Sequence, residues 1–160
     1  MIAIIDYDAG NTFNVQKALA YIGLDAVLTA DADTIVQADG VILPGVGAYA
    51  AAMTVLKERG LVEPLLEVVK QNIPLLGICL GMQLLFDESE EYGPAPGLGI
   101  IPGVVKAIPR DMGASRSSYG MESEYCASSG KCFQRHRWRI YVFCPFILCG
   151  YRFEIYYVYR

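Results

Sequence analysis

The sequence is organised around a cysteine that has one glycine two residues before it and another two residues after it. The segment Gly77-Ile78-Cys79-Leu80-Gly81 follows the apolar run Pro74-Leu75-Leu76. This pattern is the thiol version of a nucleophile elbow, in which a strand turns sharply into a helix and presents one side chain. Glycines are required there because the backbone packs tightly around the strained residue. The start of a helix also favours the thiolate, so the pattern predicts a nucleophile at Cys79.

A buried structural cysteine is the alternative at this position. A lone cysteine after several apolar residues is commonly a core residue of a strand. The two flanking glycines and the helical pattern expected over residues 80–86 favour the elbow.

Short apolar strands alternate with helical patterns over the first 113 residues. We expect strands at 2–7, 26–29, 40–43, 75–78 and 103–108, and helices at 11–22, 32–38, 49–59, 61–71 and 80–86. The charged run 87–91 is expected to be a solvated helix end, and 93–99 an irregular loop. The alternation predicts an α/β fold with an open, mostly parallel, doubly wound sheet. Because ligands bind at the carboxyl ends of such strands, the loops at 8–11 and 44–47 are expected to converge on the elbow.

Composition divides the chain near Gly113. Residues 1–113 carry six Lys and Arg against fourteen Asp and Glu, a net charge of −8, whereas residues 114–160 carry seven against three, a net charge of +4. The second part also holds four of the five cysteines, seven of the eleven tyrosines and the only histidine. We therefore predict an ordered domain over 1–113 and an aberrant, poorly packed tail over 114–160.

Three segments together resemble the class I glutamine amidotransferases. They are Asp6-Tyr7-Asp8-Ala9-Gly10-Asn11, Leu43-Pro44-Gly45-Val46-Gly47, and the elbow extended through Met82-Gln83-Leu84-Leu85-Phe86. Within that family, the pattern is similar to the glutaminase subunit of imidazole glycerol phosphate synthase. The resemblance covers residues 1 to about 113 and implies hydrolysis of glutamine to glutamate and ammonia for histidine biosynthesis.

The resemblance implies a chemistry that agrees with the elbow. The Cys79 thiolate would attack the side-chain carboxamide of L-glutamine, giving an oxyanion, then a thioester and free ammonia. Backbone N–H groups of Leu80, Val46 and Gly47 would hold the oxyanion. No metal or cofactor is implied.

The resemblance also implies substrate and partner contacts. Gly45, Gly47 and Gln83 would contact the glutamine, and Asn11 would lie near the interface with a cyclase subunit, a (β/α)₈ barrel that receives the ammonia. Taken singly, these residues have plainer interpretations. The glycine loop is then an ordinary turn, Gln83 a solvated helix residue, and Asn11 a helix cap.

The family's C-terminal Phe-His-Pro-Glu motif, which supplies the base, is absent from this sequence. The only histidine, His136, lies among arginines and is unsuited to serve Cys79. The chain as written is therefore expected to be inactive in normal glutamine hydrolysis.

A shift in reading frame accounts for the tail. If the codons of residues 116–123 are read one nucleotide later, permitted codons give Val-Pro-His-Met-Gly-Trp-Asn, and Met121 followed by Glu122 must give Trp. In the same frame, residues 141–150 can be read as Met-Phe-Phe-Val-His-Ser-Phe-Tyr-Val-Asp. Both peptides resemble family segments in the correct order. We predict an inserted nucleotide near codons 111–116, with the catalytic His and Glu encoded beyond Arg160.

The tail's other patterns favour no ligand. Cys126, Cys132, Cys144 and Cys149 lack the paired spacing of structural zinc sites. Arginines interleaved with aromatic residues are typical of nucleic-acid binding. On the frame-shift interpretation they are by-products of translation in the wrong reading frame. No apolar run reaches membrane-spanning length and no signal peptide is evident, so we expect a cytoplasmic protein.

Two other functions remain open. One is a noncatalytic remnant that binds the cyclase without hydrolysing glutamine, which the missing base favours. The other is a different cysteine-elbow α/β hydrolase, in which a histidine directly follows the cysteine or lies nearby. Here Leu80 follows Cys79, and Gln83 suits recognition of an amide.

Overall fold

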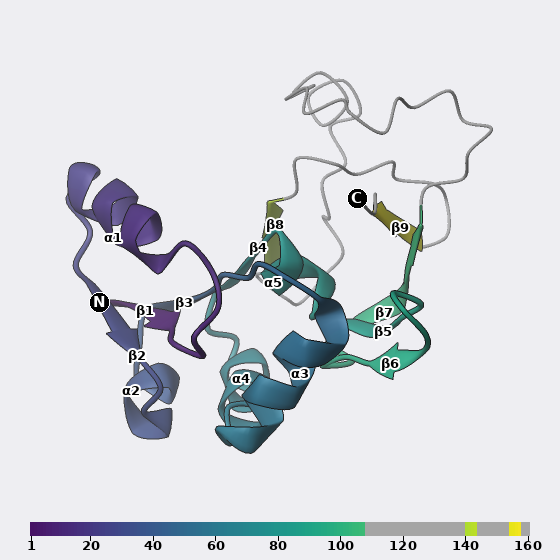
Figure 1. Cartoon of the computed structure of the whole chain (residues 1–160). Helices are drawn as coiled ribbons and strands as arrows, with labels where there is room; N and C mark the ends of the chain where they lie inside the picture. The colour runs from purple at the N-terminus through teal and green to yellow at the C-terminus, as the bar shows by residue number, and fades with distance from the viewer. Residues whose placement is uncertain (108–139, 144–153, 158–160) are drawn as a thin grey trace, which may run out of the picture.

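The computed structural model describes residues 1–107, 140–143 and 154–157 (Figure 1). Helices in this part are α1 (Thr12–Tyr21), α2 (Ala32–Val36), α3 (Tyr49–Glu58), α4 (Val62–Lys70) and α5 (Leu80–Gln83). Strands are β1 (Ile2–Ile5), β2 (Ala26–Thr29), β3 (Gly40–Leu43), β4 (Leu75–Ile78), β5 (Phe86–Ser89), β6 (Ala95–Pro96), β7 (Ile101–Ala107), β8 (Ile140–Phe143) and β9 (Glu154–Tyr157). The predicted alternation of strands and helices is confirmed as far as β4.

The main sheet is parallel and has the strand order β2-β1-β3-β4-β8. After β1 the chain moves outward to β2 and then returns to the other side of β1 to form β3. The carboxyl ends of β1 and β3 therefore lie side by side at a topological switch point, where ligands bind in sheets of this kind. Cys79 follows β4, the next strand along.

Helices cover both faces of this sheet, as a doubly wound fold requires. Successive residues of a strand point to opposite faces, and β1 divides in this way. Ala3 and Ile5 belong to the larger core, to which α2, α3 and α4 contribute, whereas Ile4 packs in a smaller core with Leu19 of α1. In Figure 1, α1 lies on one side of the sheet and the other three helices lie on the opposite side. The predicted α/β fold class is confirmed.

The chain after α5 differs from the sequence prediction. A second sheet, with the order β6-β5-β7-β9, follows the elbow helix. The expected helix over 80–86 and the expected helix end over 87–91 were wrong, because α5 ends at Gln83 and Phe86–Ser89 is a strand. Parallel pairing of Phe86 with Ile101 decides this, and Phe86 and Ser89 are buried while the two charges between them face solvent. The strand expected at 103–108 corresponds to β7, and the loop expected at 93–99 contains the short strand β6.

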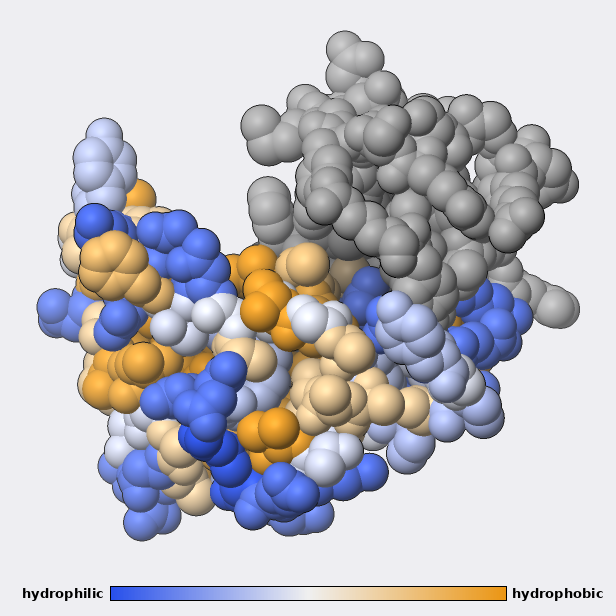
Figure 2. Space-filling model, viewed as in Figure 1, coloured by the Kyte–Doolittle hydropathy of each residue, from blue (hydrophilic) through white to orange (hydrophobic). Residues whose placement is uncertain are grey.

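Charged groups gather away from the cores. Figure 2 shows hydrophilic residues over the end of the molecule formed by α2 and the end of α3. Exposed charges there include Asp31, Asp33, Lys57 and Glu58. Among the described residues, no helix is long and apolar enough to cross a membrane.

Tyr49 carries a buried hydroxyl for which the described residues provide no hydrogen-bond partner. Burial raises the pKa of this phenol above its usual value, and Asp87 and Glu88 add to the shift. A buried hydroxyl without a partner is destabilising. We therefore expect Tyr49→Phe to leave the free energy of unfolding unchanged or to raise it by up to about 1 kcal/mol in urea denaturation. A clear loss of stability would show that the hydroxyl has a partner.

Candidate active site

Cys79 occupies the strained corner between β4 and α5. Its backbone has φ 55° and ψ −118°, a conformation that L residues rarely adopt, and its side chain is exposed. The carbonyl of Cys79 accepts hydrogen bonds from the backbone N–H groups of Met82 and Gln83, at 3.0 and 3.3 Å, which closes the first helical turn. The strand-to-helix elbow predicted from the sequence is confirmed. Because α5 has four residues, a long helix behind the cysteine is not part of this site.

The two glycines flanking Cys79 are required by backbone contacts. A Cβ atom at Gly77 would lie 2.6 Å from the Cα of Met82, and a Cβ at Gly81 would lie 1.9 Å from the carbonyl oxygen of Leu43. Both contacts are with main-chain atoms, which cannot rotate away as a side chain can. The predicted reason for these glycines, close backbone packing around the elbow, is therefore confirmed.

The loop of residues 44–47, here called the glycine loop, packs directly on the elbow. A Cβ at Gly45 would lie 2.5 Å from the backbone nitrogen of Gly81 and 2.9 Å from the Cβ of Leu80. On the other side, a Cβ at Gly10 would lie 2.8 Å from the Cβ of Pro44. The structure thus brings together the three loops expected to converge, those after β1, β3 and β4.

The outer part of the glycine loop faces open space. Val46 is 57% exposed. Gly47 has φ 97°, and a Cβ there would meet no described atom within 4 Å. Within the described residues, we find no hydrogen bond that uses the backbone N–H of Val46, Gly47 or Leu80. These groups are chemically suited to receive an oxyanion, as predicted for them; the role itself stays a prediction.

Both ends of the glycine loop are anchored by side chains from elsewhere in the chain. The Tyr7 hydroxyl donates a hydrogen bond of 2.6 Å to the carbonyl oxygen of Pro44. At the other end, the backbone N–H of Tyr49 donates to Oε2 of Glu91, also at 2.6 Å. Ala48, the residue at the start of α3, has no side chain that could cap the helix, so the Glu91 carboxylate does so.

Gln83 and Asn11 occupy less decisive positions. Gln83 is the last residue of α5 and is half-buried. Asn11 is exposed, and its Oδ1 accepts a hydrogen bond of 3.3 Å from the backbone N–H of Asn14. The structure therefore gives Asn11 the helix-cap role that was the plainer alternative. Contacts of Gln83 with a substrate and of Asn11 with a partner stay predictions.

Several sequence predictions concern residues outside the described part of the chain. They are His136 and the tail cysteines Cys126, Cys132, Cys144 and Cys149. In the described part, no three His, Cys, Asp or Glu side chains come together in a way that would hold a metal ion.

The comparisons with known proteins agree with this geometry. The family model "Glutamine amidotransferase class-I" matches residues 3–149. The chain belongs to the class I glutamine amidotransferases. A solved structure, described as the crystal structure of a glutamine amidotransferase, shares the amidotransferase fold with this chain at a TM-score of 0.54 and 22% identity, covering 63% of this chain and 53% of that one.

Curated relatives of this amidotransferase are named imidazole glycerol phosphate synthase subunit HisH. The protein from Lactiplantibacillus plantarum is 55% identical over 112 residues, covering 70% of this chain and 54% of that protein. The protein from Listeria monocytogenes is 55% identical over 111 residues (69% and 53%), and that from Streptococcus sanguinis is 54% identical over 113 residues (71% and 55%). The chain spans about half the length of the curated relatives it matches.

Two residues of this amidotransferase site were missed by sequence reasoning. Tyr7 was included in the first strand, and Glu91 was assigned to a solvated run of charge. Tyr7 contacts Pro44, which is 37 residues away in sequence, and Glu91 contacts Tyr49, which is 42 residues away. No local sequence pattern predicts contacts over such separations. For Tyr7, the one sequence signal was its position directly before the turn at 8–11, a loop expected to converge on the elbow.

Proposed function

We propose that residues 1–113 are the N-terminal part of the glutaminase subunit of imidazole glycerol phosphate synthase. The activity is hydrolysis of L-glutamine to glutamate and ammonia, with transfer of the ammonia to a cyclase subunit in the cytoplasm. The observation that carries this proposal is the exposed Cys79 at a strained elbow with the glycine loop packed against it. The name shared by the curated relatives supports the assignment to histidine biosynthesis.

The proposed chemistry begins at the Cys79 sulfur. The thiolate forms a bond to the carboxamide carbon of glutamine, and the electron pair of the C=O bond moves onto oxygen. Collapse of this intermediate breaks the C–N bond, and ammonia leaves after taking a proton from a general acid. Water then hydrolyses the thioester to glutamate and restores the thiol. The N–H groups of Leu80, Val46 and Gly47 would stabilise the oxyanion, a contribution of about 100–1000-fold for each donor in comparable sites.

The proposed partner surface includes the outer side of α1. Phe13 and Tyr21 on this helix are 62% and 92% exposed, and the Lys17 ammonium lies 4.3 Å from the centroid of the Phe13 ring. Phe13 and Tyr21 lie about two helical turns apart along α1, and large exposed apolar side chains of this kind are found at protein interaction surfaces. Asn11 at the start of the same helix would then lie at the edge of the cyclase interface.

We further propose that residues 114–160 arise from translation in another reading frame. The curated relatives match over 111 to 113 residues, which is the length of the part before the change in composition. The class-wide family model extends further, to residue 149. The boundary near residue 113 therefore rests on the change in composition, the length of the curated matches and the codon argument. Restoring the frame would supply the His and Glu that Cys79 needs for turnover.

Covalent labelling of the 160-residue chain tests the nucleophile. A chloroketone analogue of L-glutamine reacts with a thiolate by forming a C–S bond and releasing chloride. We expect this reagent to label Cys79 at least about tenfold faster than its D enantiomer, because a site shaped for glutamine orients one enantiomer for attack. Peptide mass spectrometry measures the labelling at each cysteine.

The four tail cysteines are internal controls for this experiment. Cys126, Cys132, Cys144 and Cys149 should react equally slowly with both enantiomers, and free L-glutamine should protect Cys79 alone. If Cys79 shows no preference for the L enantiomer and no protection by glutamine, the proposed glutaminase site is contradicted. A chain that binds the cyclase under those conditions would instead be the noncatalytic partner-binding protein, the second candidate that the missing base favours.

A further inference from the structure

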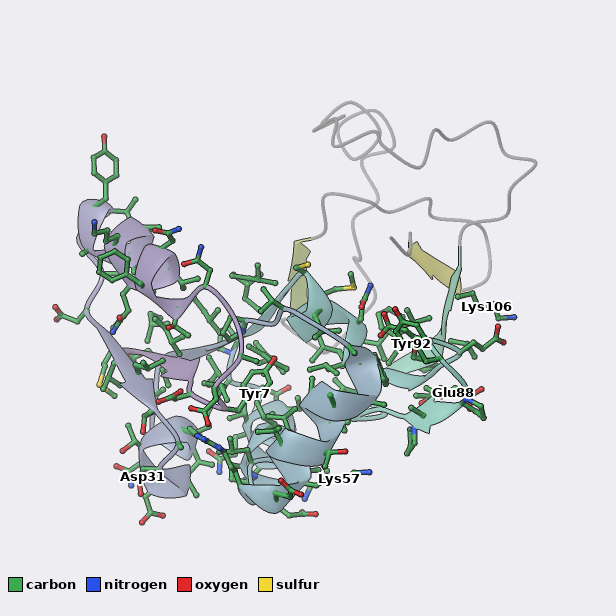
Figure 3. The ribbon with its side chains drawn as sticks, in the orientation of Figure 1. Tyr7, Asp31, Lys57, Glu88, Tyr92 and Lys106 are labelled. Carbon is green, nitrogen blue, oxygen red and sulfur yellow. The ribbon has the colours of Figure 1, made fainter. Side chains whose placement is uncertain are left out.

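The hydrogen bond between Tyr7 and Pro44 joins the segment after β1 to the first residue of the glycine loop. Tyr7 is 1% exposed and follows β1, whereas Pro44 begins the glycine loop after β3. The hydroxyl and the carbonyl oxygen are 2.6 Å apart in a buried environment. In Figure 3, the Tyr7 label marks the interior of the molecule between β1 and α3, away from Glu88 of β5 and from Tyr92 in the turn that follows β5.

The surrounding atoms leave little space for the Tyr7 hydroxyl to move. A Cβ at Gly45 would lie 2.8 Å from this oxygen, and the same Cβ would contact Gly81 and Leu80 of the elbow. The phenol, the first peptide of the glycine loop and the elbow therefore form one packed unit. Removing the hydroxyl would leave the buried Pro44 carbonyl without this partner.

The Tyr7 phenol also stays protonated and so remains a hydrogen-bond donor. Burial raises the pKa of Tyr7 well above its usual value, and the neighbouring Cys79 adds to the shift. The hydroxyl therefore keeps its proton throughout the pH range in which a cysteine nucleophile works.

A fixed carbonyl determines the direction of the rest of the peptide. The peptide bond is planar and trans, so holding the Pro44 oxygen also fixes the direction of the Gly45 N–H on the opposite side. The next two peptides carry the N–H groups of Val46 and Gly47. The segment that contains them starts at the fixed Pro44–Gly45 peptide and ends at the Tyr49 N–H, which donates a hydrogen bond to Glu91.

We propose that Tyr7 is a positioning residue for the oxyanion site, acting through its hydrogen bond to the Pro44 carbonyl. The hydroxyl holds the glycine loop so that the N–H groups of Val46 and Gly47 project toward the reaction centre at Cys79. This inference rests on the proposed function. It adds to that function a residue that acts through the glycine loop and does not itself contact the substrate or the reacting sulfur.

Tyr7→Phe tests this role because it removes the hydroxyl and keeps the buried ring. We expect labelling of Cys79 by the L-chloroketone to slow about tenfold, while its reaction with iodoacetamide stays within about twofold. In the proposed route the thiolate first adds to the ketone carbon, so the ketone oxygen gains negative charge; the sulfur then shifts to the neighbouring CH₂ and displaces chloride as the C=O bond re-forms. Direct displacement of iodide from iodoacetamide needs no oxyanion site. A general loosening of the fold would change both rates together.

A second measurement detects a change in the glycine loop directly. In ¹⁵N NMR spectra, loss of the hydrogen bond to the Pro44 carbonyl should shift the amide signal of Gly45, the next residue. Tyr49→Phe is the matched control, because it removes a buried hydroxyl that has no partner among the described residues and keeps the backbone N–H that Glu91 binds. The control should leave both the Gly45 signal and the ratio of the two labelling rates unchanged.

The outcomes separate this inference from the proposed function. An unchanged Gly45 signal in Tyr7→Phe, or equal slowing by both reagents, overturns the role of Tyr7. A native chain that shows no preference for the L-chloroketone contradicts the glutaminase proposal instead. In that case the Gly45 signal still decides whether Tyr7 positions the loop, since a shift supports the role and no shift removes it.

Discussion

Replacing Cys79 with serine in the frame-restored protein is expected to lower glutamine hydrolysis by at least about 1000-fold. A hydroxyl is a far weaker nucleophile than a thiolate at neutral pH, and loss of the nucleophile removes the covalent route as a whole. The measurement is release of ammonia from L-glutamine in the presence of the cyclase subunit. Serine differs from cysteine by one atom, so the elbow should keep its backbone conformation.

External ammonia provides the control for the serine variant. If Cys79 serves only to generate ammonia, added ammonium salt should replace it. The rate at which the complex makes imidazole glycerol phosphate from ammonium salt should then be the same in the variant and in the parent protein. Equal loss of the glutamine-dependent and ammonia-dependent activities would show that the substitution damages the complex and not the nucleophile. Full glutaminase activity in the variant would rule out Cys79 as the nucleophile.

Among the glycines whose contacts the structure describes, Gly81 is expected to show the largest structural effect of an added methyl group, as in Gly81→Ala. The new Cβ would lie 1.9 Å from the carbonyl oxygen of Leu43 and 2.7 Å from its carbonyl carbon. Either the elbow or the end of β3 must move, so we expect a loss of about 3 kcal/mol or more in the free energy of unfolding. Labelling of Cys79 by the L-chloroketone should fall at the same time, because the glycine loop rests on Gly81.

Gly40→Ala is the matched control for this substitution. Gly40 is also buried, but a Cβ there would first meet Cδ1 of Ile2 at 3.2 Å, the far end of a flexible side chain. A small rotation of Ile2 accommodates the methyl group, so a stability change within about 1 kcal/mol is expected in urea denaturation. Similar losses in the two variants would show that the close contact at Gly81 is relieved by an inexpensive movement.

The elbow was predictable because its determinants are local. The spacing of Gly77, Cys79 and Gly81 after an apolar strand specifies a tight turn, and the structure places a positive φ at the cysteine. The positions of the first four strands along the chain followed from the same kind of local pattern. The loops then met at one edge because parallel strands of a doubly wound sheet share that edge.

The second sheet was not predictable by the same reasoning. Residues 80–91 contain apolar residues at helical spacing followed by charges, which is typical of a helix that ends in solvent. Pairing of β5 with β7 decides the structure instead, and this contact joins Phe86 to Ile101. The anchoring of the glycine loop by Tyr7 and Glu91 escaped prediction for the same reason, because it depends on tertiary contacts.

Sequencing the gene tests most directly the central claim, that residues 1–113 are the nucleophile-bearing part of a glutaminase whose base is encoded in another frame. The reading should begin at codon 105 and continue for several hundred nucleotides past codon 160. We expect that removing one nucleotide between codons 111 and 116 opens a frame encoding Val-Pro-His-Met-Gly-Trp-Asn and, further on, Phe-His-Pro-Glu. A confirmed tail with no Phe-His-Pro-Glu segment in the shifted frame would contradict it.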